Sequence, residues 1–446
     1  MKIASLVVTL ASLMLLKLAQ SKIGYFWHIT DLHYDPLYAA PGDTRRQCRR
    51  TDERGSPGHQ RALGRLGDYS CDSPIDLIQS ALKFMRTRHT ENLEFVLWTG
   101  DVVSSQYSKK EEDKYRAIRS ITELLRMTFS SHFVFPVLGD TDPAPSQALT
   151  NLWSHWLPLE VFDTLNSGGY YTIEQTHSKL RIIALNTNLF NVDEEYSGPA
   201  RQQWEWLDAV LKTATAKNEM VFIVGHAAPG SDTSYSADAT SKYLRIVRRH
   251  ARVIAGQFFG HLHVDTFRVI YDEEQPVSWA FLAPSVSPHY STGASNPGLR
   301  LYKFDSDTGK VLDYTQFYLD LALANKAEAG AEWVAEYNLT QYYALRDVSA
   351  GSLHLLAEKL KTGTTHEMTM FKKYLRAYNV KYNDGGNCDD ACAHQHFCAI
   401  TCLEHVIHGQ CVDAASSALA AAGRAAAFSA PLVNIILTFI VCVAVI

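Results

Sequence analysis

The sequence predicts an α/β fold, because short apolar runs typical of buried strands alternate with stretches of helical spacing. A second observation agrees with this fold. Ligand-type side chains follow the strand ends, where α/β sheets bind their ligands. We expect strands at residues 25–30, 95–98, 133–138, 180–185, 221–224 and 253–259. We expect helices at residues 74–89, 114–127, 204–211 and 243–250.

The first three strands lead into acidic or histidine side chains. Asp31 and His33 follow the first strand and are separated by one residue. Asp101 follows a glycine at the end of the second strand, and Asp140 follows a glycine at the end of the third. An aspartate directly after such a glycine is typically placed to bridge two metal ions.

Two later strands end in histidines. The strand at 221–224 is followed by Gly-His226, and the strand at 253–259 is followed by Gly-His261-Leu-His263. Residues at i and i+2 point the same way in extended backbone. In a loop beyond a strand they can instead spread onto two neighbouring metal ions.

These positions together predict a metal site. A single His-x-His pair is weak evidence, so the prediction rests on the whole set. Mixed histidine and carboxylate ligands suit zinc, manganese or iron, whereas an all-oxygen set would suggest magnesium or calcium. Two such ions would position and activate a water for in-line attack at phosphorus. The predicted ligands are Asp31, His33, Asp101, Asp140, His226, His261 and His263.

Other polar residues near these motifs are expected to be structural. His28 lies inside the first strand, and Asp35 precedes a proline turn. The polar segment 39–72 holds Arg45, Arg46, Arg49 and Arg50. We interpret it as a solvated loop rather than a site for an anionic ligand.

The second half of the chain is expected to complete the sandwich and then become helical. Strands are expected at 279–282 and 299–304. Helices are expected at 331–337, 352–360 and 369–378.

Length and charge narrow the class of protein. The 446 residues allow one large domain and a smaller one. The 42 Lys+Arg against 47 Asp+Glu give a net charge of -5, which offers no support for binding nucleic acid through bulk charge. We therefore expect no binding to a nucleic-acid duplex, and we expect a monomer.

Both ends of the chain resemble processing signals. Residues 1–21, with an apolar run at 3–16, have the layout of a secretory signal peptide, and an uncleaved anchor is the alternative. Residues 413–446 combine small residues with an apolar tail at 431–446. This pattern predicts a stalk and a glycosylphosphatidylinositol-anchor signal, with a tail-anchor helix as the alternative. We expect a secreted protein on the extracellular side of the plasma membrane.

The cysteines agree with export. Cys48 and Cys71 flank the polar loop and are expected to pair. Disulfides are favoured for the C-terminal cluster, although His394 and His396 among them leave a zinc knuckle as the alternative. Asn338 begins a glycosylation sequon. The cluster contains an odd number of cysteines, which are Cys388, Cys392, Cys398, Cys402 and Cys411.

The order of these motifs resembles the calcineurin-type metallophosphoesterases and, more closely, the acid sphingomyelinase-like phosphodiesterases. The resemblance implies a metallophosphoesterase β-sandwich flanked by helices over residues 22–319. It also implies a smaller helical, disulfide-containing domain over 320–412. The anchor signal indicates the membrane-attached branch. The matching phrases lie at residues 26–33, 97–101, 185–188, 223–226 and 256–261, and the likeness runs from about residue 24 to 411.

The resemblance also implies two zinc ions per chain. Asp31, His33 and His263 would hold one ion, and His226 and His261 the other. Asp101 would bridge the two ions, and Asp140 would complete the second site. The implied disulfides are Cys388–Cys392 and Cys398–Cys411, which would leave Cys402 unpaired.

The function implied is hydrolysis of phosphodiesters, either sphingomyelin-like lipids or nucleotide phosphates. The third motif departs from the family, because Asp140-Thr141 stands where the family has Asn-His. Thr141 replaces the histidine that would donate a proton to the leaving group, so no catalytic side chain is assigned. The alternative is a catalytically impaired member that acts as a surface lipid- or protein-binding protein.

Overall fold

The computed structural model describes most of the chain between residues 22 and 414. The described ranges are 22–50, 63–88, 92–175, 179–191, 198–231, 235–290, 293–327, 330–361, 365–382 and 388–414. The expected signal peptide and the apolar tail lie outside the described residues. Within the described ranges, no helix has both the length and the apolar character needed to cross a membrane.

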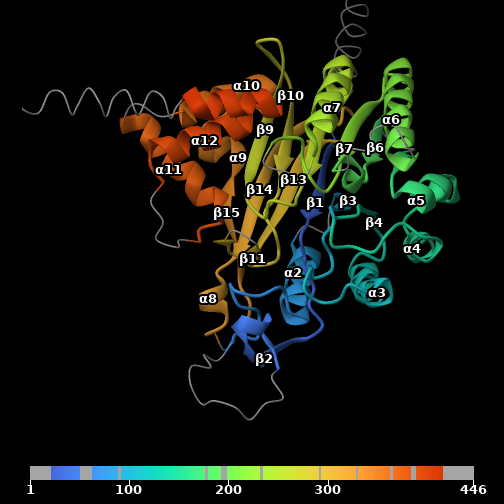
Figure 1. The fold of residues 1–446 in the computed structure, drawn as a ribbon, viewed down its shortest axis with the longest axis vertical. Coiled ribbons are helices and arrows are strands. Elements are labelled where there is room, and N and C mark those ends of the chain that lie inside the picture. The colour runs from blue at the N-terminus through green and yellow to red at the C-terminus, as the bar shows by residue number, and fades with distance from the viewer. Residues whose placement is uncertain are drawn as a thin grey trace, which may run out of the picture.

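Two six-stranded sheets form the centre of the fold (Figure 1), which confirms the predicted α/β class. The first sheet has the spatial order β15 (Trp333–Asn338), β14 (Val311–Leu319), β13 (Gly298–Asp305), β1 (Ile23–Ile29), β3 (Leu93–Trp98) and β4 (Phe133–Pro136). The second has the order β5 (Tyr171–Glu174), β6 (Leu180–Ala184), β7 (Met220–Val224), β8 (Ile254–Phe259), β10 (Gln275–Leu282) and β9 (Thr266–Asp272).

The strands that carry the predicted ligands are parallel neighbours. In the first sheet β1 pairs with β3, and β3 pairs with β4. In the second sheet β6, β7 and β8 run parallel in that order. Parallel strands bring their carboxyl ends to one edge of a sheet. All five ligand-bearing strands therefore end on the same side of the molecule.

An aromatic core joins the two sheets. The ring of Phe26 on β1 lies 5.5 Å from that of Phe222 on β7 and 5.3 Å from that of Phe258 on β8. Within its own sheet, Phe26 stacks on Phe95 and Tyr302 at 4.9 and 4.7 Å. Burial of such large rings is the main favourable term in folding. It also fixes the spacing of the sheets, and hence that of the strand ends.

Helices cover the outer faces of the sandwich. The buried faces of α6 and α7 pack on the second sheet, and α2 lies against the first. In Figure 1 the C-terminal helices α10 to α12 lie across the sheets from α3 to α6. The helices are α2 (Ile75–Thr87), α3 (Glu111–Thr128), α4 (Gln147–Trp153), α5 (Phe162–Gly168), α6 (Gly198–Lys217), α7 (Ala237–His250), α8 (Leu321–Ala324), α9 (Leu339–Tyr343), α10 (Ala350–Leu360), α11 (Thr365–Tyr378) and α12 (Asp390–Thr401).

The helix predicted at 331–337 is wrong, because this segment forms β15 and extends the first sheet beyond β14. Trp333 and Tyr337 are buried on one face of the strand. Residues four apart share a face in both a helix and a strand, so their spacing did not distinguish the two. The expected helices at 352–360 and 369–378 correspond to α10 and α11. Helix α10 packs on β9 and β10, α12 packs on β9, and α11 packs on α10 and reaches β9 through Tyr374.

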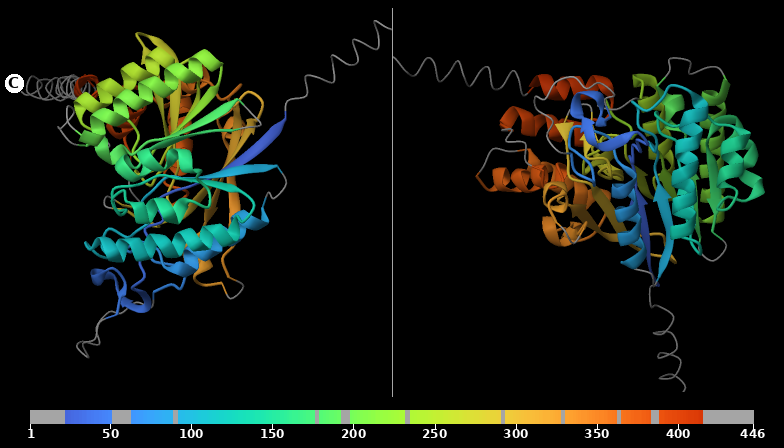
Figure 2. Two further views of the ribbon diagram at one scale, coloured as in Figure 1. Left: turned by 90° about the vertical axis from the view of Figure 1, so that its right-hand side faces the viewer. Right: turned by 90° about the horizontal axis from the view of Figure 1, so that it is seen from below.

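Among the described residues three disulfides are formed, and they follow the expected pairs. Cys48–Cys71 closes the polar loop beside β2 (Tyr38–Asp43). Cys388–Cys392 closes the start of α12, Cys398–Cys411 ties α12 to the segment that follows it, and Cys402 is a free thiol. These bonds consume the thiols that a zinc knuckle would need. Figure 2 shows the stapled N-terminal segment, in blue, at one end of the molecule.

Candidate metal centre

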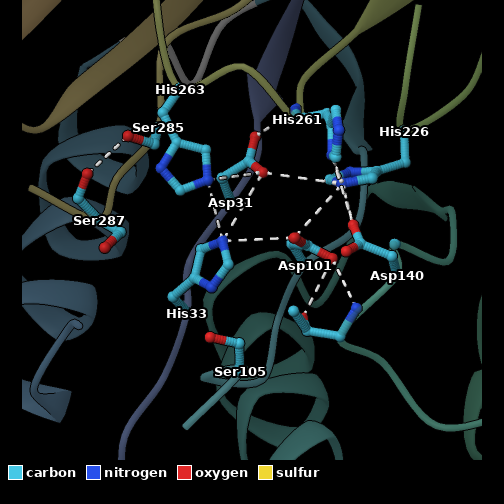
Figure 3. Close-up of polar contacts among 12 residues, drawn as sticks. Asp31, His33, Asp101, Ser105, Asp140, His226, His261, His263, Ser285 and Ser287 are labelled. Carbon is cyan, nitrogen blue, oxygen red and sulfur yellow. Dashed lines mark hydrogen bonds and ion pairs between the residues drawn. The ribbon is translucent and has the colours of Figure 1, made fainter. Parts of the chain in front are cut away.

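The structure brings all seven predicted ligands together at the shared edge of the two sheets (Figure 3). They form two groups of four that share Asp101, and the ligand atoms within each group lie within 4.8 Å of one another. The first group is Asp31, His33, Asp101 and His263. The second group is Asp101, Asp140, His226 and His261.

Most of these residues adopt a backbone conformation that side chains avoid. Asp31, His33, Asp101, His261 and His263 all have φ between 41° and 72°, in the left-handed region. Such conformations are uncommon for residues other than glycine and each costs on the order of 1–3 kcal/mol. Their concentration at one sheet edge indicates a site at which strain is retained to aim side chains inward.

Two glycines allow the strand ends to approach so closely. A Cβ atom at Gly139 would lie 2.1 Å from Oδ1 of Asp101. A Cβ atom at Gly260 would lie 2.0 Å from Oγ1 of Thr30 and 2.5 Å from Oδ2 of Asp31. A side chain at either position would therefore displace a predicted ligand.

The first group places two imidazole nitrogens and two carboxylate oxygens close together. Nε2 of His33 lies 3.0 Å from Nε2 of His263 and 3.4 Å from Oδ2 of Asp101. Oδ1 of Asp31 lies 3.3 Å from Nε2 of His263. All four side chains are nearly buried, so this group forms the deeper half of the centre.

The second group is closer to solvent. Nε2 of His226 lies 3.4 Å from Oδ2 of Asp101 and 3.2 Å from Oδ1 of Asp140. Nδ1 of His261 lies 3.4 Å from Oδ1 of Asp140 and 3.1 Å from Nε2 of His226. The Asp140 side chain is 53% exposed, whereas that of His226 is 1% exposed.

Asp101 is positioned so that one oxygen faces both groups. Its Oδ1 atom accepts hydrogen bonds from the main-chain nitrogen and from the hydroxyl of Thr141, each at 3.0 Å. Its Oδ2 atom faces His33 and His226 equally, at 3.4 Å from each. Thr141 thus fixes the orientation of the shared carboxylate, a role that its sequence position did not reveal.

Main-chain carbonyl groups set the tautomers of two histidines. Nδ1 of His226 donates to the carbonyl oxygen of Thr99 at 2.7 Å, and Nδ1 of His263 donates to that of His289 at 3.0 Å. In its neutral form, each of these rings presents an unprotonated Nε2 to the centre. This arrangement is typical of metal-binding histidines, which donate their second ring N–H to a carbonyl or a carboxylate.

The residues present fit a cation. Oδ1 of Asp31 is buried, points into the first group and has no hydrogen-bond partner among the described residues. Burial lowers the pKa of His33, but Asp31, Asp101 and Asp72 raise it to about 9 overall. Burial likewise lowers the pKa of His226, and Asp101 and Asp140 together raise it well above its usual value. A proton is therefore held where a metal ion would balance the carboxylates.

An open cleft lies above the two groups. It is a cavity of about 250 Å³ that contains the exposed Asp140 side chain. The wall residues come from six separate parts of the chain. Besides the predicted ligands His33, Asp101, Asp140, His261 and His263, the cleft is lined by Asp72, Ser105, Gln106, Thr141, His289 and Tyr290.

Asp142 is a functional residue that the ligand pattern did not include. Its carboxylate accepts hydrogen bonds from the main-chain nitrogens of Val102 and Gly139, at 2.8 and 2.9 Å. Burial and the charge of Asp101 raise its pKa to about 7. Asp142 thereby links the loop that carries Asp101 to the loop that carries Asp140. In the sequence, only its position in the third motif indicated that it would lie near the centre.

The residues expected to be structural have structural partners. His28 is buried and hydrogen-bonds Thr99 at 2.8 Å; burial lowers its pKa to about 3. Asp35 accepts hydrogen bonds from the Arg49 guanidinium and the main-chain nitrogen of Leu37. The exposed Arg45 and Arg46 are consistent with a solvated loop.

Comparison with known proteins agrees with this geometry. The family model described as calcineurin-like phosphoesterase matches residues 24–265. The model described as acid sphingomyelin phosphodiesterase C-terminal region matches residues 275–418. Together they cover both the sandwich and the C-terminal helices.

Several named proteins are similar over most of the chain. Acid sphingomyelinase-like phosphodiesterase 3b of Homo sapiens is 34% identical over 436 residues, covering 91% of this chain and 92% of that protein. Cyclic GMP-AMP phosphodiesterase SMPDL3A of Homo sapiens is 34% identical over 419 residues, covering 87% and 90%. Sphingomyelin phosphodiesterase of Bos taurus is 30% identical over 406 residues, covering 83% of this chain and 63% of that protein.

The fold and the paired ligand groups are those expected of a metallophosphoesterase. The chain belongs to the calcineurin-like phosphoesterases and, within them, to the acid sphingomyelinase-like phosphodiesterases. It is thus a phosphoric diester hydrolase by family, and the family implies a divalent metal.

Proposed function

We propose that this chain hydrolyses phosphodiesters in the cleft above the two ligand groups, with two zinc ions per chain. The observation that carries the proposal is the shared Oδ2 atom of Asp101, which lies at the same distance from a histidine of each group. The mixed histidine and carboxylate ligands suit zinc. When bound, the ions neutralise the phosphate and lower the pKa of an attacking water.

The residues of the chain have separate tasks in this proposal. Asp31, His33 and His263 would hold one ion, and Asp140, His226 and His261 the other, with Asp101 common to both. Thr141 holds Asp101, and the carbonyl groups of Thr99 and His289 hold two of the histidines. Asp140 and His261 are the most exposed ligands, so they lie nearest to a substrate that enters the cleft.

The open cleft favours turnover over the alternative of a purely lipid- or protein-binding surface protein. A cavity of about 250 Å³ leaves room for a phosphate and its first substituents. Relatives named as cyclic GMP-AMP and sphingomyelin phosphodiesterases support nucleotide and sphingolipid phosphodiesters as the substrate classes. Thr141 cannot donate a proton as a histidine would, so we propose that esters with stable leaving anions are cleaved best.

Metal analysis combined with a substrate panel tests this function. Purified protein should contain two metal ions per chain by elemental analysis, and chelation should abolish hydrolysis of bis(p-nitrophenyl) phosphate. Zinc should restore it, and sphingomyelin should be cleaved more slowly than the nitrophenyl ester. Protein that takes up no zinc, or that cleaves neither ester when loaded, would contradict the proposal.

The proposed setting is the extracellular face of the plasma membrane, with a monomer held there by a lipid anchor. The apolar runs at 3–16 and 431–446 and the three disulfides support this setting. Phosphatidylinositol-specific phospholipase C should release the protein from intact cells. Retention after this treatment would instead indicate a membrane-spanning tail.

A further inference from the structure

The cleft contains a histidine that neither ligand group uses. His289 begins the short hairpin of β11 (His289–Tyr290) and β12 (Gly293–Ala294). Its side chain lines the cleft opened by the ligands and is 29% exposed. Its carbonyl oxygen accepts the hydrogen bond from Nδ1 of His263, at 3.0 Å. The main chain of this residue therefore serves the centre, and its imidazole remains available to a substrate.

The hairpin is held firmly against the centre. The main-chain nitrogen of Ser287 donates to the carbonyl oxygen of Asp31 at 3.0 Å, and that of Val286 donates to the carbonyl oxygen of Thr30 at 3.2 Å. The Ser287 hydroxyl donates to the His289 carbonyl at 3.3 Å. These bonds fix the start of the hairpin to the first ligand strand, so the position of His289 relative to the ligands is set by the fold.

A nearly buried carboxylate lies beside the His289 ring. Oδ1 of Asp72 lies 3.7 Å from Nδ1 of His289, and the Asp72 side chain is only 6% exposed. The neighbouring Ser73 exchanges main-chain hydrogen bonds with the ligand loop, donating to the His33 carbonyl at 3.0 Å. A carboxylate behind one ring nitrogen orients an imidazole and stabilises its positive charge. The second ring nitrogen is then the one left for the cleft.

The position from which the family would supply a proton is already occupied. The Thr141 hydroxyl donates its hydrogen to Asp101, so it has none to offer a leaving group. We propose that His289, oriented by Asp72, protonates the leaving group of the substrate from the other wall of the cleft. The inference rests on the proposed phosphodiester hydrolysis and adds a catalytic residue to it.

The proposed step is balanced. The bond between phosphorus and the incoming water oxygen forms while the bond between phosphorus and the leaving oxygen breaks. The leaving oxygen takes the electron pair of that bond and one proton from the His289 ring. The attacking water loses one proton to the solvent in the cleft, and the solvent returns one proton to the ring after the alcohol departs.

A series of aryl methyl phosphodiesters, from p-nitrophenyl to unsubstituted phenyl, tests the inference. We expect His289→Asn to lower kcat/KM by about 100-fold or more for the phenyl ester, within the range of general acid catalysis. For the p-nitrophenyl ester, kcat/KM of the same variant should fall by less than about threefold, because nitrophenolate leaves without a proton. Asp72→Asn should also lower kcat/KM more for the phenyl ester than for the p-nitrophenyl ester, but by less than His289→Asn does. Metal content should stay at two per chain, because the carbonyl contact to His263 is main-chain.

His155→Asn is the matched control. His155 is exposed and lines a different pocket, with Phe133 at the opposite end of β4 from Asp140. His155→Asn should leave kcat/KM for both esters unchanged. An equal loss on both esters, or loss of metal in His289→Asn, would overturn the role of His289 while leaving the proposed function intact. If wild-type protein loaded with zinc cleaves none of the esters, the proposed function and this inference both fail.

Discussion

Thr141 lacks the proton-donating side chain that the family has at this position, but it makes contacts of its own with a predicted metal ligand. Without a histidine at this position, the third motif itself supplies no proton donor to the leaving group. The same threonine, however, makes two hydrogen bonds to Oδ1 of Asp101. The main-chain bond would survive substitution, whereas the hydroxyl bond is specific to this residue. The third motif therefore contributes to the orientation of the shared ligand rather than to proton donation.

The double change Asp140→Asn with Thr141→His should raise the turnover of alkyl esters more than that of aryl esters. The new histidine adds a donor, and removal of one carboxylate raises the positive charge of the loaded centre and its attraction for phosphate. The measurement is kcat/KM for a methyl-leaving and a nitrophenyl-leaving diester in wild-type and changed protein. An equal rise in kcat/KM for both esters, or no rise, would contradict the interpretation that Thr141 removes a proton donor for the leaving group.

Asp101→Asn should empty both halves of the centre, because its Oδ2 atom faces both. Residues that merely orient a ligand typically cost 10–100-fold in affinity or activity, so loss of this ligand should lower activity by more than about 100-fold. Elemental analysis should find fewer than two metal ions per chain. Asp163→Asn, an exposed aspartate on α5, should keep both ions. Two ions retained in Asp101→Asn would show that the carboxylate is not shared.

At the scale of elements, the sequence was most informative where strands end. The ligands were predictable because each follows an apolar strand, and parallel strands must end at one edge. Asp72 and His289 were not predictable as a pair, because they approach each other only after the stapled loop and the β11 hairpin are folded. The strand β15 was mistaken for a helix, since Trp333 and Tyr337 share a face in either structure.

The loop after β8 depends on the absence of a side chain at Gly260. Gly260→Ala would place a Cβ atom 2.0 Å from the Thr30 hydroxyl, so the first ligand loop must shift. We expect metal affinity to fall by about 10–100-fold, measured by competition with a chromogenic chelator. Gly351→Ala on α10, where a Cβ would meet nothing within 4 Å, should leave affinity unchanged. Equal affinity in both variants would mean that the loop can relax freely.

For the molecule as a whole, the centre lies at the edge of two sheets that pack together through an aromatic core. Its carboxylates need positive charge in the folded state, and either metal ions or protons can supply it. In the metal-free protein the histidines take this role, because nearby carboxylates raise the pKa of His33 and His226 despite their burial. Metal loading should therefore change how the stability of the entire fold depends on pH.

The sign of this dependence follows from His33. Its pKa is raised from 6.5 to about 9 in the metal-free fold, so the stability that its proton contributes is fully present below about pH 6.5. That stability is lost as the pH rises through 9, and the loss is on the order of 1–3 kcal/mol. Thermal unfolding of the chelated protein should therefore occur at a lower temperature at pH 9 than at pH 6. Protein loaded with zinc and then desalted should not show this decrease, because the ions replace the protons. Other titrating groups act on both forms alike, so the difference between the two forms is the measured quantity. The same decrease in both forms would show that the centre does not bind cations in the folded protein.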